Sequence, residues 1–397
     1  MRPMSIAVST VLPKLSVGER DRRYGRIREL LRERGVDCAI ATGTNLFYLT
    51  NGISGQRTGL LPAVDEPLLV AVNGRHLADL PAEVIVQSQD WVSDVRPGND
   101  ASPLIDRLRE LKLENGAIGL ADANVPHNLY AQLAKALPDA RLIDVSDVFV
   151  NVRTIKSDEE VDMIEQANRV FDAGIQGMYQ HVRPGMTGAQ ASQEMVKAMW
   201  QAGGDLDSMI SVNFGAVPKQ NPVLADLCLD RAIQWGDVAT LTAHAEYGHY
   251  AGHSDQEIVF GEATPLHREM FEAGIEVRQA VLKHLKPGST QRDLIDAYRQ
   301  ACQQTKFKAS PHSQIHQYGI DVPEFAGPAF RVADTGSEGR LGSAGNFRLE
   351  AGMVYSISPT IVAPNGEDTI LGGTSLVVTE TGYRNLGDRE VEMLVVR

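Results

Sequence analysis

The pattern of hydrophobic residues changes once along this chain, near residue 155, and that change limits the folds open to it. Before this point, segments with helical spacing of apolar residues alternate with short runs of Ala, Ile, Leu and Val. After it, long helical segments and strands come in groups. The first pattern is typical of an α/β domain and the second of an α+β domain. We therefore expect two domains, over residues 1–154 and 155–397, which suits a length of 397 residues.

The elements of the first domain follow from spacing and from glycine. Apolar residues recur at helical spacing in residues 18–34, and Gly35 is expected to end that helix. Similar arguments predict helices over 102–111 and 125–137, and buried strands over 37–42, 68–72 and 116–122.

The second domain opens on a helix signal and contains a repeated corner. Ser157 followed by Glu160 is a capping box, which predicts a long amphipathic helix after it. Residues 184–187 and 287–290, 103 residues apart, both read Pro-Gly-x-Thr. Pro-Gly stops one helix, and the threonine can cap the next. Two such corners indicate a duplicated half-domain.

Composition excludes several classes of partner. A net charge of −13 argues against nucleic acid and against an anionic membrane surface. No window of eighteen uncharged apolar residues predicts a membrane span. The three cysteines show no CxxC pattern, which fits a reducing compartment without a zinc-thiolate site. The first fifteen residues lack a small-residue cleavage pattern, so we expect a cytoplasmic protein rather than a secreted one.

Five of the ten histidines lie in two short stretches, and these are the candidate catalytic segments. His244, His249 and His253 lie within ten residues, and His316 follows His312 by four residues. Imidazole is the side chain whose ordinary pKa allows proton transfer near neutral pH, and it is also a common metal ligand. Two distant histidine segments in one domain therefore predict one assembled site.

The residues around His253 predict a prepared general base. On an extended strand His253 and Asp255 point to the same face. A carboxylate beside an imidazole raises its pKa and fixes its tautomer. The alternative is a solvated hairpin edge with ordinary polar side chains. His316 is expected to donate to a carbonyl oxygen or to protonate a leaving nitrogen, and His244 to share in proton transfer.

Four segments, in this order, resemble the pita-bread family, which includes methionine aminopeptidase, prolidase, aminopeptidase P and creatinase. They are residues 153–160 (RTIKSDEE), residues 236–255 with the AEYGHYAGHSD hairpin, residues 312–319 (HSQIHQYG) and residues 349–359 (LEAGMVYSISP). The resemblance covers nearly the whole chain. It implies a creatinase-like α/β N-terminal domain and an α+β pita-bread catalytic domain.

The departures from the family pattern concern its metal ligands. Metal-dependent members bind two divalent ions through two Asp, one His and two Glu. In this chain those positions fall, in the same order, at His244 (or Thr242 with a short insertion), Asp255, His316, Ser358 and Gly373. Because the carboxylates that would offset two divalent charges are missing, we expect no metal and no other cofactor. One metal held by His244, Asp255 and His316 remains the alternative.

The resemblance also indicates residues that bind a substrate. The family's active-site His before Asn-Pro appears here as Gln220, whose amide can orient substrate or water but cannot act as a base. Ser358 is either a nucleophile or a small polar residue where a glutamate was lost. His312 either contacts substrate or supports His316. Glu324 is assigned to substrate binding as well.

A loop of the N-terminal domain completes the predicted site. In creatinase-like proteins the corresponding loop of one subunit closes the site of the other, so we expect a homodimer. Arg57 resembles the arginine of that loop that binds a substrate carboxylate, a task that suits the guanidinium fork, and Tyr48 lies beside it. The alternative is a surface arginine on a mobile loop.

These expectations combine into one predicted function. The chain would be a metal-independent, creatinase-like hydrolase of a C–N bond in a small carboxylated molecule. His316, His253 and His244 would share proton transfer, with Asp255 orienting one of them. Three alternatives stay open: a mononuclear metal-dependent hydrolase or Xaa-Pro peptidase of the same fold, a non-catalytic binding protein, and a lyase.

Overall fold

The computed structural model describes residues 14–52, 57–72, 90–98, 100–205, 209–215, 230–310, 314–321, 324, 330–331, 347–366, 368–370, 373 and 375–397. Within it the chain divides into two compact units, one over Lys14–Arg153 and the other from Thr154 to Arg397. The expectations for Gln220, His312 and the start of the chain lie outside the described residues. No helix in the described part is long and apolar enough to cross a membrane.

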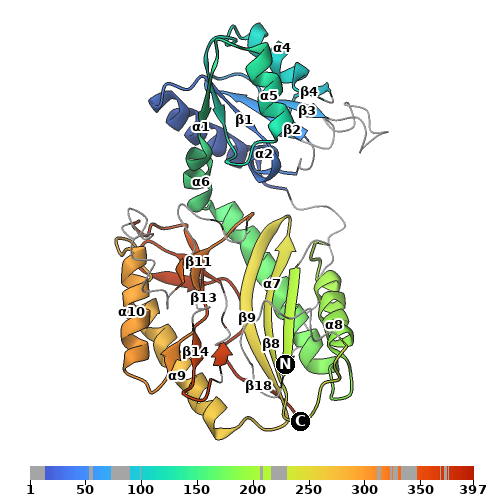
Figure 1. Cartoon of the computed structure of the whole chain (residues 1–397), viewed down its shortest axis with the longest axis vertical. Helices are drawn as coiled ribbons and strands as arrows, with labels where there is room; N and C mark the ends of the chain where they lie inside the picture. The colour runs from blue at the N-terminus through green and yellow to red at the C-terminus, as the bar shows by residue number, and fades with distance from the viewer. Residues whose placement is uncertain are drawn as a thin grey trace. The chain divides into compact units, whose positions relative to one another are not determined.

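The first unit is a mixed six-stranded sheet with helices, in the order β4-β3-β2-β1-β5-β6 (Figure 1). Strand β1 pairs parallel with β5 and antiparallel with β2, so the sheet is not purely parallel. Its elements are α1 (Val17–Glu33), β1 (Cys38–Ala41), α2 (Gly43–Thr50), β2 (Arg57–Pro62), β3 (Leu69–Val72), β4 (Asp94–Pro97), α4 (Ser102–Glu110), β5 (Ala117–Leu120), α5 (His127–Ala136), β6 (Arg141–Asp144) and α6 (Ser146–Thr154).

Local signals explain how these elements begin and end. The Ser16 hydroxyl accepts from the Glu19 amide and caps α1. Gly35 follows that helix with φ of +63°, a conformation that favours glycine. The apolar stripe of α1, including Ile27 and Leu31, is fully buried. The helices and strands predicted for this domain are confirmed within one or two residues at each end.

The second unit combines two larger sheets, one small sheet and four long helices. The sheets run β18-β9-β8-β7, β12-β11-β13-β16-β17 and β10-β14-β15. The elements are α7 (Asp158–His181), α8 (Gly188–Gln201), β7 (Met209–Gly215), β8 (Val238–Tyr247), β9 (Tyr250–Phe260), α9 (Pro265–Leu282), α10 (Gln291–Gln303), β10 (Lys308–Ala309), β11 (Gln314–Gln317), β12 (Phe330–Arg331), β13 (Val354–Ile357), β14 (Thr360–Val362), β15 (Asp368–Ile370), β16 (Leu376–Val378), β17 (Tyr383–Asn385) and β18 (Leu394–Val396).

The predicted helix starts of this unit are confirmed. Ser157 and Glu160 exchange both bonds of a capping box at the start of α7. Thr187 and Thr290 do the same at the starts of α8 and α10. Each threonine also forms an isolated antiparallel bridge, Thr187 to Ala232 and Thr290 to Arg348. The two Pro-Gly-x-Thr corners therefore share a cap, a new helix and a bridge, which agrees with a duplicated half-domain.

The long β8–β9 hairpin has one apolar face and one polar face. Leu241, Ala245, Ile258 and Phe260 belong to the core that α7 and α8 cover (Figure 1). Gly252 lets the hairpin approach α7 closely, since a Cβ there would lie 2.4 Å from the Asn168 amide nitrogen. Because side chains alternate along a strand, the residues between these point to the other face.

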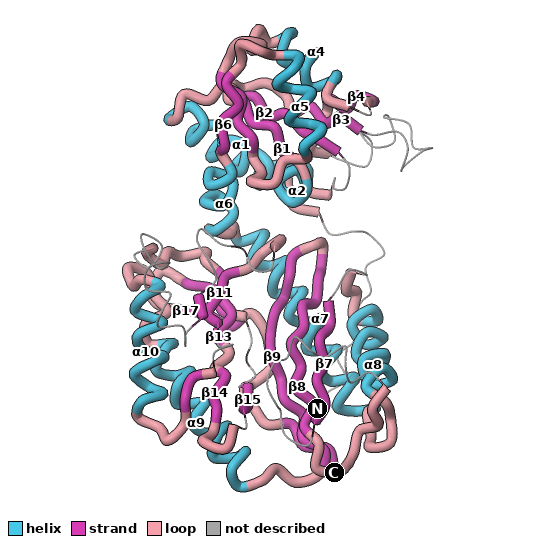
Figure 2. Tube along the Cα trace, viewed as in Figure 1, coloured by secondary structure: helices cyan, strands magenta, loops and turns pink. Residues whose placement is uncertain are grey.

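The β11–β13 pair is arranged in the same way. Ile315, Tyr355 and Ile357 join the core beneath α9 and α10, which flank this sheet in Figure 2. The alternating residues His316 and Ser356, which are paired in register, therefore point away from that core. Two sheets of one unit thus each present a polar face, and the candidate site is built from these faces.

Candidate functional site

Three of the predicted histidines come together. His244 on β8 and His253 on β9 are directly paired, with ring centroids 4.4 Å apart at an angle of 75°. His316 comes from β11 in the other sheet, and its ring lies 5.0 Å from that of His253. The two sequence segments thus form one cluster, with His253 in the middle. His249 instead is exposed at the hairpin turn.

Burial keeps two of these imidazoles uncharged at neutral pH. Desolvation lowers the pKa of His244 to about 2, with repulsion from His253 and His316 adding to the effect. Desolvation also lowers the pKa of His316 to about 3, with His253 adding to it. The Nδ1 atom of His316 is buried without a hydrogen-bond partner. A neutral imidazole with an unused nitrogen can still accept or donate a proton to a bound molecule.

Asp255 is the carboxylate of this cluster. It lies on the same face of β9 as His253 and is buried. Its negative charge opposes the fall in the pKa of His316, so it stabilises the protonated form of that imidazole. Asp255 is paired in register with Thr242 of β8, which is the alternative position for the family's first aspartate. The side chain of Thr242 lies outside the described part of the structure. The structure thus brings together the four residues that the sequence assigned to catalysis.

Three buried polar side chains, those of Tyr318, Ser375 and Asn168, lie around the cluster. The sequence did not indicate them as site residues. Tyr318 lies 6.1 Å from the His253 ring and 6.3 Å from that of His316, and burial raises the pKa of its phenol. Ser375 donates 2.6 Å to the side chain of Asn168 and lies 3.0 Å from the His253 carbonyl oxygen. The His-x-Tyr spacing was a signal for Tyr318, which directly follows β11 two residues after His316.

The two positions of the missing glutamates also lie close to this cluster. Ser358 is buried just beyond the end of β13, two residues after Ser356, the partner of His316 in register. The amide of Gly373 donates 3.2 Å to the carbonyl oxygen of Asp255. Both positions at which the family resemblance implies a glutamate therefore lie beside the cluster, and neither residue offers a carboxylate.

Glu324 makes a buried ion pair. Its carboxylate lies 2.8 Å from the Lys156 ammonium, and both side chains are almost fully buried. A Cβ at Gly319 would meet the Glu324 carboxylate and the end of the Lys156 side chain, so a larger residue there would displace the pair. The pair connects the segment before α7 to the segment after β11. Its visible role is structural, and binding of substrate by Glu324 stays a prediction.

Tyr48 and Arg57 belong to the first unit. The Tyr48 ring is buried beneath the guanidinium of Arg23, 3.9 Å from its centroid, and the Tyr48 carbonyl oxygen accepts from Arg23 at 2.7 Å. This stacking anchors α2 to α1. Arg57 begins β2, and partial burial lowers the pKa of its guanidinium. Their contact with substrate stays a prediction.

Two other features of the second unit lie apart from the histidine cluster: a group of possible metal ligands and a surface hollow. Among the described residues, one group of three has ligand atoms within 4.8 Å of one another, namely Asp205, Glu246 and His249 around the hairpin turn. Its Asp205 carboxylate already accepts from the His249 amide at 2.7 Å.

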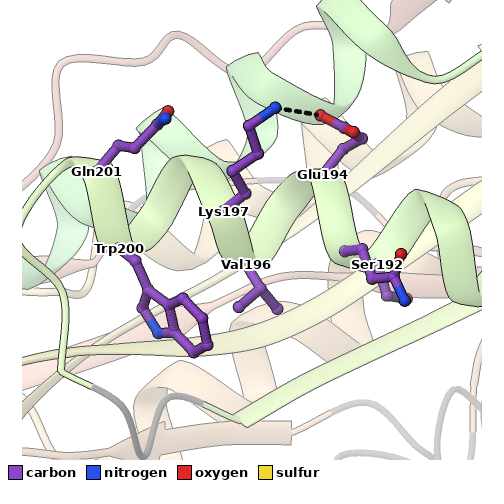
Figure 3. A pocket seen from close by; sticks show the side chains of 7 residues that line it. Ser192, Glu194, Val196, Lys197, Trp200 and Gln201 are labelled. Atoms are coloured by element: carbon purple, nitrogen blue, oxygen red, sulfur yellow. Dashed lines mark ion pairs between the residues drawn. The ribbon is translucent and has the colours of Figure 1, made fainter.

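Figure 3 shows a hollow on α8 lined by Trp200 and by the Glu194 side chain, among others. The clustered histidines do not line it.

Comparison with known proteins covers both units. Residues 162–381 match the model of metallopeptidase family M24, and residues 23–155 match the creatinase/prolidase N-terminal domain. A creatinase from Bacillus sp. (strain B-0618) is 24% identical over 387 residues, covering 95% of this chain and 92% of its own. An Xaa-Pro dipeptidase from Pyrococcus horikoshii is 24% identical over 381 residues, covering 93% of this chain and 97% of its own.

Solved structures agree in fold. An Xaa-Pro dipeptidase from Bacillus anthracis superposes with a TM-score of 0.78 at 19% identity, covering 95% of this chain and all of that one. An X-Pro aminopeptidase from Thermotoga maritima gives a TM-score of 0.76 at 20% identity, covering 94% and 99%. The fold predicted from four short segments is confirmed. The chain belongs to metallopeptidase family M24, with a creatinase-type N-terminal domain ahead of a pita-bread domain.

Proposed function

We propose that this protein hydrolyses a C–N bond of a small carboxylated molecule without a metal ion, by proton transfer among the clustered histidines. The observation that carries the proposal is the cluster of His244, His253 and His316 beside the carboxylate of Asp255. Such a set can move protons, because two of its imidazoles are neutral at physiological pH and one carboxylate stabilises the imidazolium that forms.

The donor set does not fit the two metal ions that the family name implies. Two divalent charges are normally offset by several shared carboxylate oxygens, and in the described part of this cluster Asp255 stands with three imidazole rings. The family's glutamate positions hold Ser358 and Gly373. In the described part of the chain, no three ligand atoms of the histidine cluster converge within 4.8 Å. We therefore route no step through a metal.

The proposed reaction follows from the chemistry of these groups. One imidazole, His316 or His253, removes a proton from water as the water oxygen attacks the carbon of the C–N bond. The resulting imidazolium, stabilised by Asp255, returns that proton to the departing nitrogen. The bond between carbon and nitrogen then breaks, and the amine leaves. The buried phenol of Tyr318 stays protonated and serves as a hydrogen-bond donor beside the rings.

A second candidate is a dipeptidase that acts before proline. The observation that favours it is the match with Xaa-Pro dipeptidases over more than nine-tenths of the chain. It would need one metal held by His244, Asp255 and His316, or else the same histidine chemistry applied to a peptide bond.

Release of amine from three substrate classes, measured with and without a chelator, distinguishes the metal-independent hydrolase from the dipeptidase. The classes are guanidino acids, N-carbamoyl amino acids and Xaa-Pro dipeptides. We expect turnover of a guanidino or carbamoyl acid that a chelator does not change. Turnover of Xaa-Pro dipeptides alone, dependent on added divalent metal, would contradict the proposal. Binding of all three classes without turnover would indicate the non-catalytic alternative.

A further inference from the structure

A half-buried arginine near the cluster has no acidic partner among the described residues. Arg278 lies on α9, and burial lowers the pKa of its guanidinium. Its Nε donates 3.3 Å to the carbonyl oxygen of Ile357, and the Tyr383 phenol is the one other group seen to act on its charge. In the part of the chain that the structure describes, no carboxylate forms an ion pair with it. A half-buried guanidinium without an ion pair among these residues can accept a negatively charged group as its partner.

The surroundings of Arg278 connect it to the histidine cluster. A Cβ at Gly373 would lie 3.2 Å from the Arg278 Nε and 3.4 Å from its Nη2. The amide of Gly373 donates to the carbonyl oxygen of Asp255, and Ile357 directly precedes Ser358. The guanidinium therefore approaches the strand ends that carry the site, at a position where residue 373 has no side chain.

A second arginine in this region, Arg389, has its charge and its hydrogen bonds paired within the protein. Arg389 donates to the Asp172 carboxylate at 3.0 Å and to the side chain of Gln256, and it also lies 3.4 Å from the Gly373 carbonyl oxygen. Its charge is thus balanced within the protein. Among the described residues Arg278 donates one hydrogen bond, from Nε, and its two terminal nitrogens have the geometry of a fork.

We propose that Arg278 binds the carboxylate of the substrate. This rests on the proposed function, which requires a carboxylated molecule beside the histidines. A carboxylate would supply the missing counter-charge and accept two parallel hydrogen bonds from the guanidinium fork. It would also hold the molecule at a fixed distance from His316, which lies in the same compact unit. The sequence analysis assigned this task to Arg57, which lies in the other unit.

Formate is a probe of this site that needs no knowledge of the substrate. The Nε–Hε resonance of Arg278, identified by its loss in Arg278→Lys, would be followed by NMR in the full-length protein during a formate titration. We expect a saturable shift that exceeds the effect of sodium chloride at equal ionic strength, and that persists in Arg57→Lys. A shift that is absent, or that chloride reproduces equally, would overturn the assignment.

Kinetics with the turned-over acid and its matched amide give a second test. Arg278→Gln should raise KM for the acid by roughly tenfold to a hundredfold, as expected for a lost bond to a charged group, and leave KM for the amide within about twofold. Equal effects on acid and amide would contradict a role in carboxylate binding.

Failure of this inference can be distinguished from failure of the proposed function. His316→Gln should abolish turnover and leave the formate response of Arg278 unchanged. If the formate response is present but the histidine variants keep full turnover, the anion site stands and the catalytic assignment falls. If the histidine variants are inactive and formate does not bind, the catalytic assignment stands and Arg278 is excluded.

Discussion

His316 is the residue whose removal should cost the most activity. It is buried, its Nδ1 has no partner within the protein, and Asp255 supports its protonated form. Loss of a general acid or base normally lowers the rate by about 10²- to 10⁴-fold. We therefore expect His316→Gln to lower kcat by that amount on the true substrate, while circular dichroism stays unchanged. The exposed His127 provides the control, and full turnover in His316→Gln would exclude the assignment.

Burial of these imidazoles also predicts how stability depends on pH. The folded-state pKa values of His244 and His316, about 2 and about 3, lie below the ordinary value near 6.5. Between those values the unfolded chain binds more protons than the folded one, so the free energy of unfolding falls as the pH is lowered below about 6.5.

Denaturant titrations at pH 7.5 and pH 5.5 check this dependence. The wild type should be less stable at pH 5.5, and His244→Asn should lose less stability between the two values. In NMR spectra, the ring signals that disappear in His244→Asn and His316→Gln should not move between pH 5.5 and pH 8. Signals that titrate with a midpoint near 6.5 would show that the imidazoles are not buried as described.

At the residue scale the sequence indicated which histidines and which aspartate cluster, and not the groups around them; the catalytic roles of the cluster stay predictions. His244, His253, His316 and Asp255 were found because imidazoles and carboxylates are rare enough to stand out. The supporting groups were missed for a physical reason: Asn168, Ser375 and Tyr318 come from three distant segments and have no distinctive spacing. Glu324 was assigned to substrate although its buried partner is Lys156, because an ion pair between distant residues leaves no local pattern.

The β8–β9 hairpin is the element that fixes the geometry of the site, and its contact with α7 is its most restrictive point. A Cβ at Gly252 would lie 2.4 Å from the Asn168 amide nitrogen and 2.5 Å from the Ala167 carbonyl carbon. These are backbone atoms within a helix and cannot move aside cheaply. We expect Gly252→Ala to lower the free energy of unfolding by about 1–3 kcal/mol.

Thermal unfolding measures this effect against a matched glycine. Gly25 lies inside α1 with nothing within 4 Å of an added Cβ, so Gly25→Ala should raise stability by roughly 0.5–1 kcal/mol. An unchanged melting temperature in Gly252→Ala would show that the hairpin does not pack against α7 in the described way.

Elements with strong local signals were predicted, and elements held by tertiary contacts were not. The capping boxes at Ser157, Thr187 and Thr290 each mark a helix start, since the cap depends on residues three apart. By contrast, the pairing of β11 with β13, which aligns His316 with Ser356, joins segments forty residues apart. No local pattern encodes that register, so the face that His316 occupies came from the resemblance and not from the residues alone.

For the whole molecule, we propose a homodimer in which the N-terminal unit of one subunit completes the site of the other. Sedimentation analysis should give a mass twice the chain mass of 43.2 kDa. If Arg57 serves the partner's site, mixing inactive Arg57→Ala and His316→Gln chains should restore about a quarter of wild-type activity, because half the dimers are mixed and each carries one intact site. A monomer, or no recovery on mixing, would contradict this proposal.

The central claim is that a member of a metallopeptidase family works here without metal. Elemental analysis of protein purified without an affinity tag, with turnover compared before and after chelation, tests it most directly. The histidine cluster predicts less than about 0.1 metal ion per subunit and turnover unchanged by the chelator. Close to one metal ion per subunit, with activity lost on chelation and regained on adding the metal, would contradict it and favour a mononuclear site at His244, Asp255 and His316.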